Sequence, residues 1–141
     1  MKKIIFVLIA FVSLQLSAQS SAKSKAIELF KANGKASHYT DLFLENGGAS
    51  ETDAKIAAVL EDIAGVYAMY LNEQDLQTMI DFYKTEVGQR VANGLSRTDE
   101  EAVAAYGEFS RTEAMSKFLK NAKNIGVKEA EIRDAWIASL K

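Results

Sequence analysis

The chain has 141 residues, no cysteine and a formal net charge of −2. Without cysteine, disulfide bonds, thiol chemistry and Cys-ligated zinc are excluded. The mild acidity argues against nucleic acid as a partner, because proteins that bind nucleic acid present basic faces to the phosphates.

The N-terminus has the three parts of a secretory signal peptide. Met1-Lys2-Lys3 is a short basic region, Ile4 to Leu16 is almost wholly apolar, and Ala18 offers a small residue for cleavage. The apolar run is shorter than the roughly 20 residues that a membrane-spanning helix needs. We therefore expect removal of residues 1–18, with cleavage after Ala22 as the alternative, and an exported protein, periplasmic or secreted, without stable membrane insertion.

The remainder divides into a leader and one domain. Residues 19–25 are mostly Ser, Ala and Lys, which predicts a flexible leader, and residues 26–141 are predicted to form a single helical domain. A short amphipathic helix is predicted to begin at Ala26 and to end near Asn33-Gly34. A second one is predicted from Ser37 to Asn46-Gly47-Gly48, because glycine doublets mark turns.

A longer third helix is predicted to begin at a capping box formed by Ser50 and Asp53. Its apolar stripe has helical spacing and comprises Ile56, Val59, Leu60, Ile63, Val66, Tyr67 and Tyr70. Gly65 lies in its middle at a cost of about 1 kcal/mol relative to Ala, which suggests the close approach of a neighbouring helix.

The stretch from Leu71 to Leu95 has the strongest periodicity, with a stripe at Leu76, Ile80, Tyr83, Val87 and Val91. Asn72 is a good N-cap, and Asp75 places negative charge in the first turn. Thr85 can cap a second helix that carries an ion pair between Glu86 and Arg90. The stretch is therefore either one helix or two helices with a kink near Lys84-Thr85.

The same stretch resembles a family of small secreted bacterial helical proteins, the domain of unknown function numbered twenty-fifty-nine. The residues that carry the resemblance are Tyr70, Leu76, Phe82, Tyr83, Gly88, Gln89 and Arg90. Thr85-Glu86 stands where the family usually has Ser-Pro, and Arg90 stands where it usually has Lys. The resemblance covers Ile56 to Leu95 and implies an all-helical secreted domain without assigned catalytic residues.

Beyond Leu95, Thr98 and Glu101 form a predicted capping box for a helix whose inner face carries Val103, Tyr106 and Phe109. Part of the preceding stretch then recurs. Phe82-x-Lys84-Thr85-Glu86 is repeated 27 residues later as Phe109-x-Arg111-Thr112-Glu113, and each copy carries a possible Thr cap and an acid–base pair at helical spacing. This is either a pair of similar helix–kink–helix units or a chance match between helix boundaries.

The C-terminal part predicts an inner face at Met115, Phe118, Leu119 and Ala122. A break is predicted at Asn124 and Gly126, followed by a last helix from Glu129 to Leu140 with Ile132, Trp136 and Leu140 inward. No segment alternates with period two as a strand would. The predicted fold is an all-α, single-domain bundle of about six to eight helices.

No catalytic, cofactor-binding or metal-binding residue is predicted. His38, the single histidine, has one carboxylate a turn away at Asp41, whereas zinc sites need three or four ligands. The neighbouring acids Glu61 and Asp62 do not face each other on a helix, and the acids at 99–101 fit the first turn of a capped helix. We therefore predict that the protein is not an enzyme.

Aromatic side chains provide the only candidate binding surface, which comprises Tyr67, Tyr70, Tyr83, Tyr106 and Trp136. Their spacing equally fits the rim of a core. The leading interpretation is an exported, non-catalytic interaction or accessory module that binds a protein partner in the cell envelope. The alternative is a carrier of a small apolar ligand or lipid, which requires an enclosed cavity. A hydrolase is the least supported class.

Overall fold

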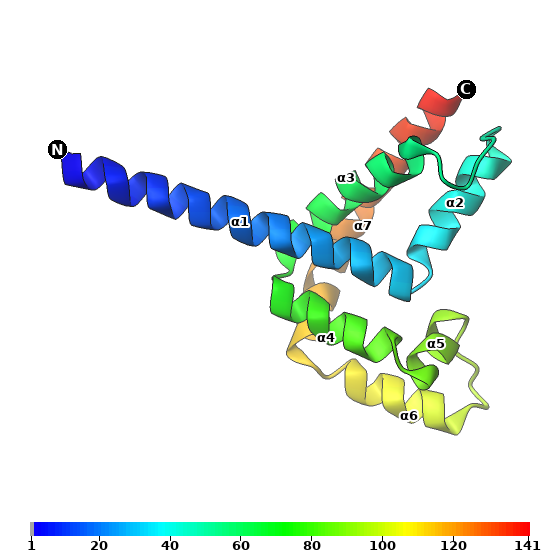
Figure 1. Ribbon diagram of the computed structural model, residues 1–141. Coiled ribbons are helices and arrows are strands. Elements are labelled where there is room, and N and C mark those ends of the chain that lie inside the picture. The colour runs from blue at the N-terminus through cyan, green and yellow to red at the C-terminus, as the bar shows by residue number, and fades with distance from the viewer. Residues whose placement is uncertain (1) are drawn as a thin grey trace.

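The computed structural model describes residues 2–141, and side chains from Ser17 onward. Within that range the chain forms helices and no strand, so the predicted all-α fold is confirmed (Figure 1). Seven helices are present in the described residues: α1 (Lys2–Ala32), α2 (Lys35–Glu45), α3 (Ala54–Tyr70), α4 (Glu73–Tyr83), α5 (Glu86–Ala92), α6 (Glu100–Phe109) and α7 (Glu113–Leu140).

The C-terminal half of α1 lies at the centre of the fold and packs against both α3 and α4. Helices α2 and α3 lie on one side of it and α4, α5 and α6 on the other (Figure 1). Helix α7 contacts both α3 and α4, and so it joins the two groups. The centre is closed by side chains without solvent exposure, among them Leu29, Phe30, Ile63, Leu76 and Ile80.

The predicted flexible leader is wrong, because residues 19–25 lie inside α1. Ala22 is only 4% exposed in the core, and the Ser21 hydroxyl donates a hydrogen bond of 2.7 Å to Glu73. The segment contains neither Gly nor Pro, so nothing in it stops the helix before the predicted start at Ala26. The predicted signal peptide, residues 1–18, falls almost wholly outside the side chains that the structure describes.

Both predicted ends of the next helical segments are confirmed. Helix α1 ends before Gly34, and α2 ends before Gly47, which adopt φ of 84° and 94°. Glycine reaches these left-handed conformations without the steric cost that a side chain adds. Helix α2 begins at Lys35, two residues before the predicted start at Ser37.

Helix α3 begins one short turn later than predicted. The Asp53 side chain is the N-cap and accepts from the Lys55 amide at 2.8 Å, whereas the Ser50 hydroxyl pairs with Thr52. The predicted stripe is buried except for the half-buried Tyr70. The close approach predicted at Gly65 is wrong, because a Cβ there would meet no atom within 4 Å.

Helix α7 is continuous, so the break predicted at Asn124 and Gly126 is wrong. Ile125 lies between these two residues and is 2% exposed, and its burial outweighs the cost of about 1 kcal/mol that a glycine adds to a helix interior. Leu119, predicted to point inward, is 54% exposed. Ile132, Trp136 and Leu140 pack half-buried against the core as predicted.

Burial in this core raises the pKa of the Tyr67 hydroxyl above its ordinary value of 10. A group whose pKa is higher in the folded state contributes stability below its unfolded pKa, and this contribution is lost at higher pH. We therefore expect the free energy of unfolding to fall above about pH 10. Urea unfolding should show a smaller loss in Tyr67→Phe than in the unaltered protein, and equal losses would contradict this role of Tyr67.

Candidate functional site

The turn between α4 and α5 is built around the hydroxyl of Thr85. This hydroxyl accepts from the Gly88 amide at 2.9 Å and donates to the Phe82 carbonyl at 2.7 Å. Thr85 therefore caps α5, and the two-helix alternative for this stretch is confirmed. The N-cap predicted at Asn72 is confirmed as well, since Asn72 and Asp75 bond reciprocally in a capping box.

The same turn recurs between α6 and α7. The Thr112 hydroxyl accepts from the Met115 amide at 3.3 Å and donates to the Phe109 carbonyl at 2.7 Å. Helix α6 is capped by Asp99, which accepts from the Ala102 amide, and not by the predicted Thr98, whose hydroxyl pairs with Ser96. The N-caps of α4 and α6, Asn72 and Asp99, are 27 residues apart, and so are the N-caps of α5 and α7, Thr85 and Thr112.

Loss of either threonine cap should cost about 1 kcal/mol of stability, the usual value for an N-cap. We expect Thr85→Ala and Thr112→Ala to lower the free energy of unfolding by similar amounts, measured by chemical denaturation. Thr85→Ser and Thr112→Ser are the matched controls, because serine keeps the capping oxygen. An effect at only one of the two positions would show that the turns are not equivalent.

We call residues 72–92 unit 1 and residues 99–119 unit 2. Each unit sends a basic side chain to the start of the other. Arg90 of unit 1 contacts Asp99 at 3.3 Å and Glu101 at 2.5 Å, instead of the predicted Glu86. Lys117, at the equivalent position of unit 2, contacts Asp75 at 3.0 Å, and this hydrogen bond is the main cause that raises the pKa of Lys117.

Two equivalent phenylalanines join the units. The rings of Phe82 and Phe109 stack with centroids 4.0 Å apart and planes 7° from parallel. Helix α5 packs on α6 just as α4 packs on α7. Reciprocal contacts of this kind are those of a two-fold axis, here within one chain. The repeated motif in the sequence therefore marks two structurally equivalent helix–turn–helix units, as the first of the two alternatives predicts.

An open groove of about 530 Å³ lies between the two units. It is lined by the equivalent pairs Thr78 and Ala105, Phe82 and Phe109, and Thr85 and Thr112, together with Val87, Glu101 and Glu108. The groove differs from the aromatic surface predicted from the sequence, and none of those five residues lines it. Extending the register of 27 residues backward from the phenylalanines to Thr78 and Ala105 would have indicated it.

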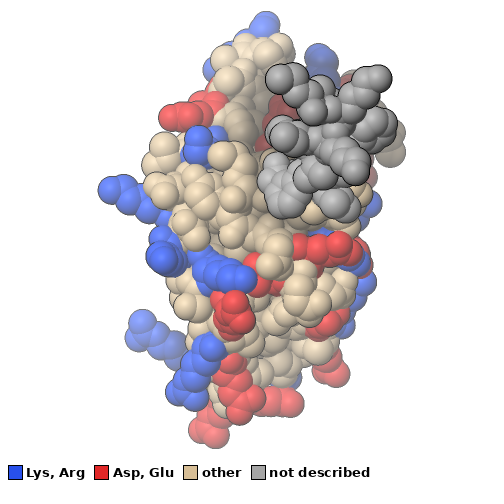
Figure 2. Space-filling view, turned by 90° about the vertical axis from the view of Figure 1, so that its left-hand side faces the viewer, with Lys and Arg blue, Asp and Glu red and all other residues tan. Residues whose placement is uncertain are grey.

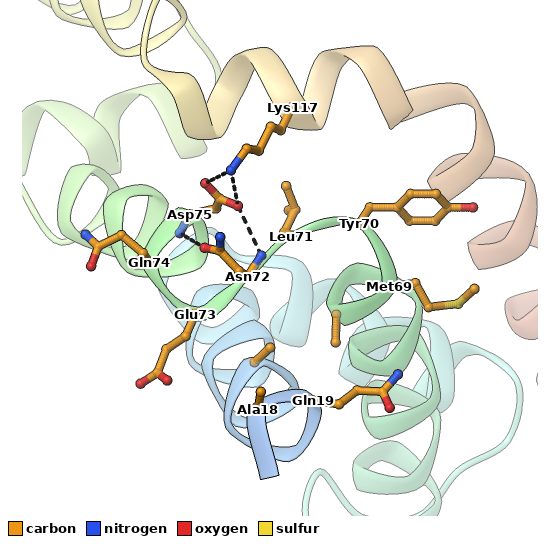
Figure 3. A pocket seen from close by; sticks show the side chains of 12 residues that line it. Ala18, Gln19, Met69, Tyr70, Leu71, Asn72, Glu73, Gln74, Asp75 and Lys117 are labelled. Carbon is orange, nitrogen blue, oxygen red and sulfur yellow. Dashed lines mark hydrogen bonds and ion pairs between the residues drawn. The ribbon is translucent and has the colours of Figure 1, made fainter. Parts of the chain in front are cut away.

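A second hollow, of about 810 Å³, lies where α3 turns into α4 beside Ala18 and Gln19 of α1 (Figure 3). Its buried carboxylate is Asp75, which is 6% exposed. One oxygen accepts from the Asn72 amide, and both are within 3.1 Å of the Lys117 ammonium. These contacts use the carboxylate to fix the start of α4, and the Tyr70 ring is directed away from the ion pair (Figure 3).

The five aromatic residues predicted as a binding surface have different neighbours in the fold, and their role in binding stays a prediction. Tyr67 is buried beside Phe30, with ring centroids 4.9 Å apart. Tyr83 and Tyr106 lie near Phe109, Tyr70 lines the second hollow, and Trp136 lies near Tyr39 and Phe43. Helical spacing places each of these residues on the apolar stripe of its own helix, but the stripes of different helices pack against different neighbours.

The described side chains contain no cluster of three or more His, Cys, Asp or Glu that could hold a metal ion. His38, Asp81 and Arg97 are exposed. Side chains of both signs occupy the face toward which α1 projects, which is thus not a continuous basic surface (Figure 2). From Ser17 onward, no helix combines the length and apolarity that a bilayer span requires.

Comparison with known families agrees with the resemblance seen in the sequence. Residues 57–95 match the DUF2059 family model. The family is described as an uncharacterized protein conserved in bacteria. The DUF2059 match covers most of α3 and all of α4 and α5, and it ends just before unit 2. Neither curated proteins nor solved structures gave a match to the chain.

Gly88, which lies within the stretch that matches DUF2059, fits closely into the turn of unit 1. A Cβ on this residue would overlap the Phe82 carbonyl oxygen and would lie 2.8 Å from the carbonyl carbon. The amide of Gly88 meanwhile donates to Thr85. Position 88 therefore requires glycine, because no residue with a Cβ fits so close to the backbone at the end of α4.

Proposed function

We propose that the protein is an exported, non-catalytic helical module that binds a partner polypeptide in the groove between units 1 and 2. The observation that carries this proposal is the open groove floored by the stacked rings of Phe82 and Phe109. Apolar concave surfaces of this size are where partner side chains are buried and gain most of their binding free energy.

Export is supported by the basic and apolar N-terminus, and the fold favours one of the two candidate cleavage points. Cleavage after Ala18 leaves the hydrogen bond between Ser21 and Glu73 and the buried Ala22 in the mature chain. Cleavage after Ala22 would remove both. We therefore propose that the mature chain begins at Gln19.

The absence of catalysis is supported by how the polar groups of the groove are used. The hydroxyls of Thr85 and Thr112 each donate to a carbonyl and accept from an amide. A hydroxyl held in this way has no base that could activate it as a nucleophile. The carboxylate of Asp75, in the other hollow, is similarly held by a backbone amide and by Lys117.

A small apolar ligand is the second candidate occupant. The groove volume of about 530 Å³ lies within the range of roughly 300–1,000 Å³ that is common for ligand pockets. The groove is open along its length, however, whereas a carrier encloses its ligand to shield it from water. This openness favours side chains that remain attached to a polypeptide.

Native mass spectrometry of the protein exported by its own N-terminal segment tests the proposal. We expect the mass of a chain that begins at Gln19, in the periplasmic or secreted fraction. A cytoplasmic protein with an intact N-terminus would overturn export. Catalytic turnover of a hydrolase substrate that a single substitution abolishes would overturn the non-catalytic assignment, and a bound lipid that leaves on denaturation would favour the carrier.

A further inference from the structure

We infer that the groove selects a polypeptide segment in which apolar side chains lie between two basic residues. This inference rests on the proposed binding function and specifies its partner. It is drawn from the acids and the apolar surface that the two units place in and beside the groove.

Two exposed carboxylates lie at equivalent positions of the two units. Glu108 lines the groove from α6. Asp81 stands 27 residues earlier, on the face of α4 that also carries Thr78 and Phe82. Asp81 accepts a hydrogen bond of 2.7 Å from the neighbouring Gln77, which fixes the position of its carboxylate. Glu108 therefore lines the groove itself, and Asp81 lies beside it, on the same face of α4 as the lining residues Thr78 and Phe82.

The charge of the lining has one sign. Besides Glu108, the lining contains Glu101 and no Lys, Arg or His. Glu101 is already paired with Arg90, so the charge that remains to attract a partner belongs to Glu108 and to its equivalent Asp81. Cationic side chains that meet these acids at the rim set the orientation and the rate of association more than the affinity.

The floor between the two acids is apolar. The Phe82 and Phe109 rings are stacked, and the hydroxyls of Thr85 and Thr112 are engaged by their own turns. These threonines are therefore not free to donate hydrogen bonds to a ligand. A ligand on this floor is bound by apolar contact, so its centre must be apolar. The two features together specify a basic–apolar–basic segment.

The test uses the full chain exported and processed by cells, with two short synthetic peptides as probes. One peptide has leucines flanked by lysines, and the other has the same leucines flanked by glutamates. Amide chemical shifts in NMR spectra report where each peptide binds. We expect the lysine peptide to shift the signals of Thr78, Thr85, Ala105 and Thr112, and the glutamate peptide to bind at least about tenfold more weakly.

Matched variants separate charge from shape. The double variant Asp81→Lys/Glu108→Lys should reverse the preference between the peptides, whereas Asp41→Lys/Glu45→Lys on α2, also at exposed acids, should leave it unchanged. Ala105→Trp should block the groove. Ala104→Trp places the same ring on the exposed neighbouring position of α6 and should not affect binding.

Three outcomes would overturn the inference. The first is equal affinity for the two peptides, and the second is chemical-shift changes confined to the hollow near Tyr70. The third is that neither peptide binds in the groove while an uncharged apolar probe such as decane does. Each is read from spectra of folded protein. They are independent of the mass and turnover measurements that test export and catalysis, so failure of this inference and failure of the proposed function are distinguishable.

Discussion

Gly88→Ala should lower the free energy of unfolding by about 3 kcal/mol, near the upper end of the usual range for overpacking. The new Cβ would overlap the backbone carbonyl of Phe82. A backbone group cannot rotate away as the end of a flexible side chain can, so the turn between α4 and α5 must shift. The change should also weaken the cap, because the Gly88 amide donates to Thr85. Urea denaturation with a linear extrapolation measures the loss.

Gly65→Ala is the matched control. Gly65 is also helical, but a Cβ there would meet nothing within 4 Å. Alanine is the better helix former by about 1 kcal/mol, so this variant should be more stable than the unaltered protein. Opposite signs at the two glycines would establish that contact with the Phe82 backbone, and not helix propensity, fixes Gly88. A mild effect of Gly88→Ala would refute that explanation.

Phe109→Ala should have the second large effect, a loss of about 3–4 kcal/mol. Phe109 is 5% exposed, and its removal takes one ring from the stack with Phe82 and leaves a cavity between the units. Thermal and urea unfolding should agree on the loss. Phe109→Leu retains most of the apolar volume, and we expect it to lose less than half as much stability.

A double-mutant cycle isolates the ring contact itself. Phe82→Leu, Phe109→Leu and the double variant should give a coupling free energy of about 1 kcal/mol, the usual magnitude for a well-oriented aromatic pair. The cycle corrects for the area that each leucine still buries. A coupling of zero would mean that the rings are neighbours without mutual stabilisation, and that the reciprocal ion pairs and helix contacts hold the units together.

Features encoded within a few residues were predictable from the sequence. The capping box of Asn72 and Asp75 needs only residues three apart, and so does the cap that Thr85 gives to Gly88. The helix ends at Gly34 and Gly47 follow from a conformation that glycine favours. The all-α fold follows from the stripes, because each helix with an apolar face needs another helix to cover it.

Features that depend on distant neighbours were not predictable in this way. Residues 19–25 read as a leader because their composition is polar, yet Ala22 is buried against the rest of the core. Gly126 read as a helix break, but the burial of the adjacent Ile125 keeps α7 continuous. The tyrosines were grouped by residue type, whereas the groove is organised by the symmetry that relates Phe82 to Phe109.

The connection between α5 and α6 has a practical consequence. Residues 93–98 are all exposed, and they are the only covalent link between unit 1 and unit 2. The interface between the units is closed by the stacked rings and by ion pairs from both sides. Cleavage of the chain in this segment would thus give two fragments, each carrying one of two complementary surfaces. Their reassembly could be followed as in a split reporter protein.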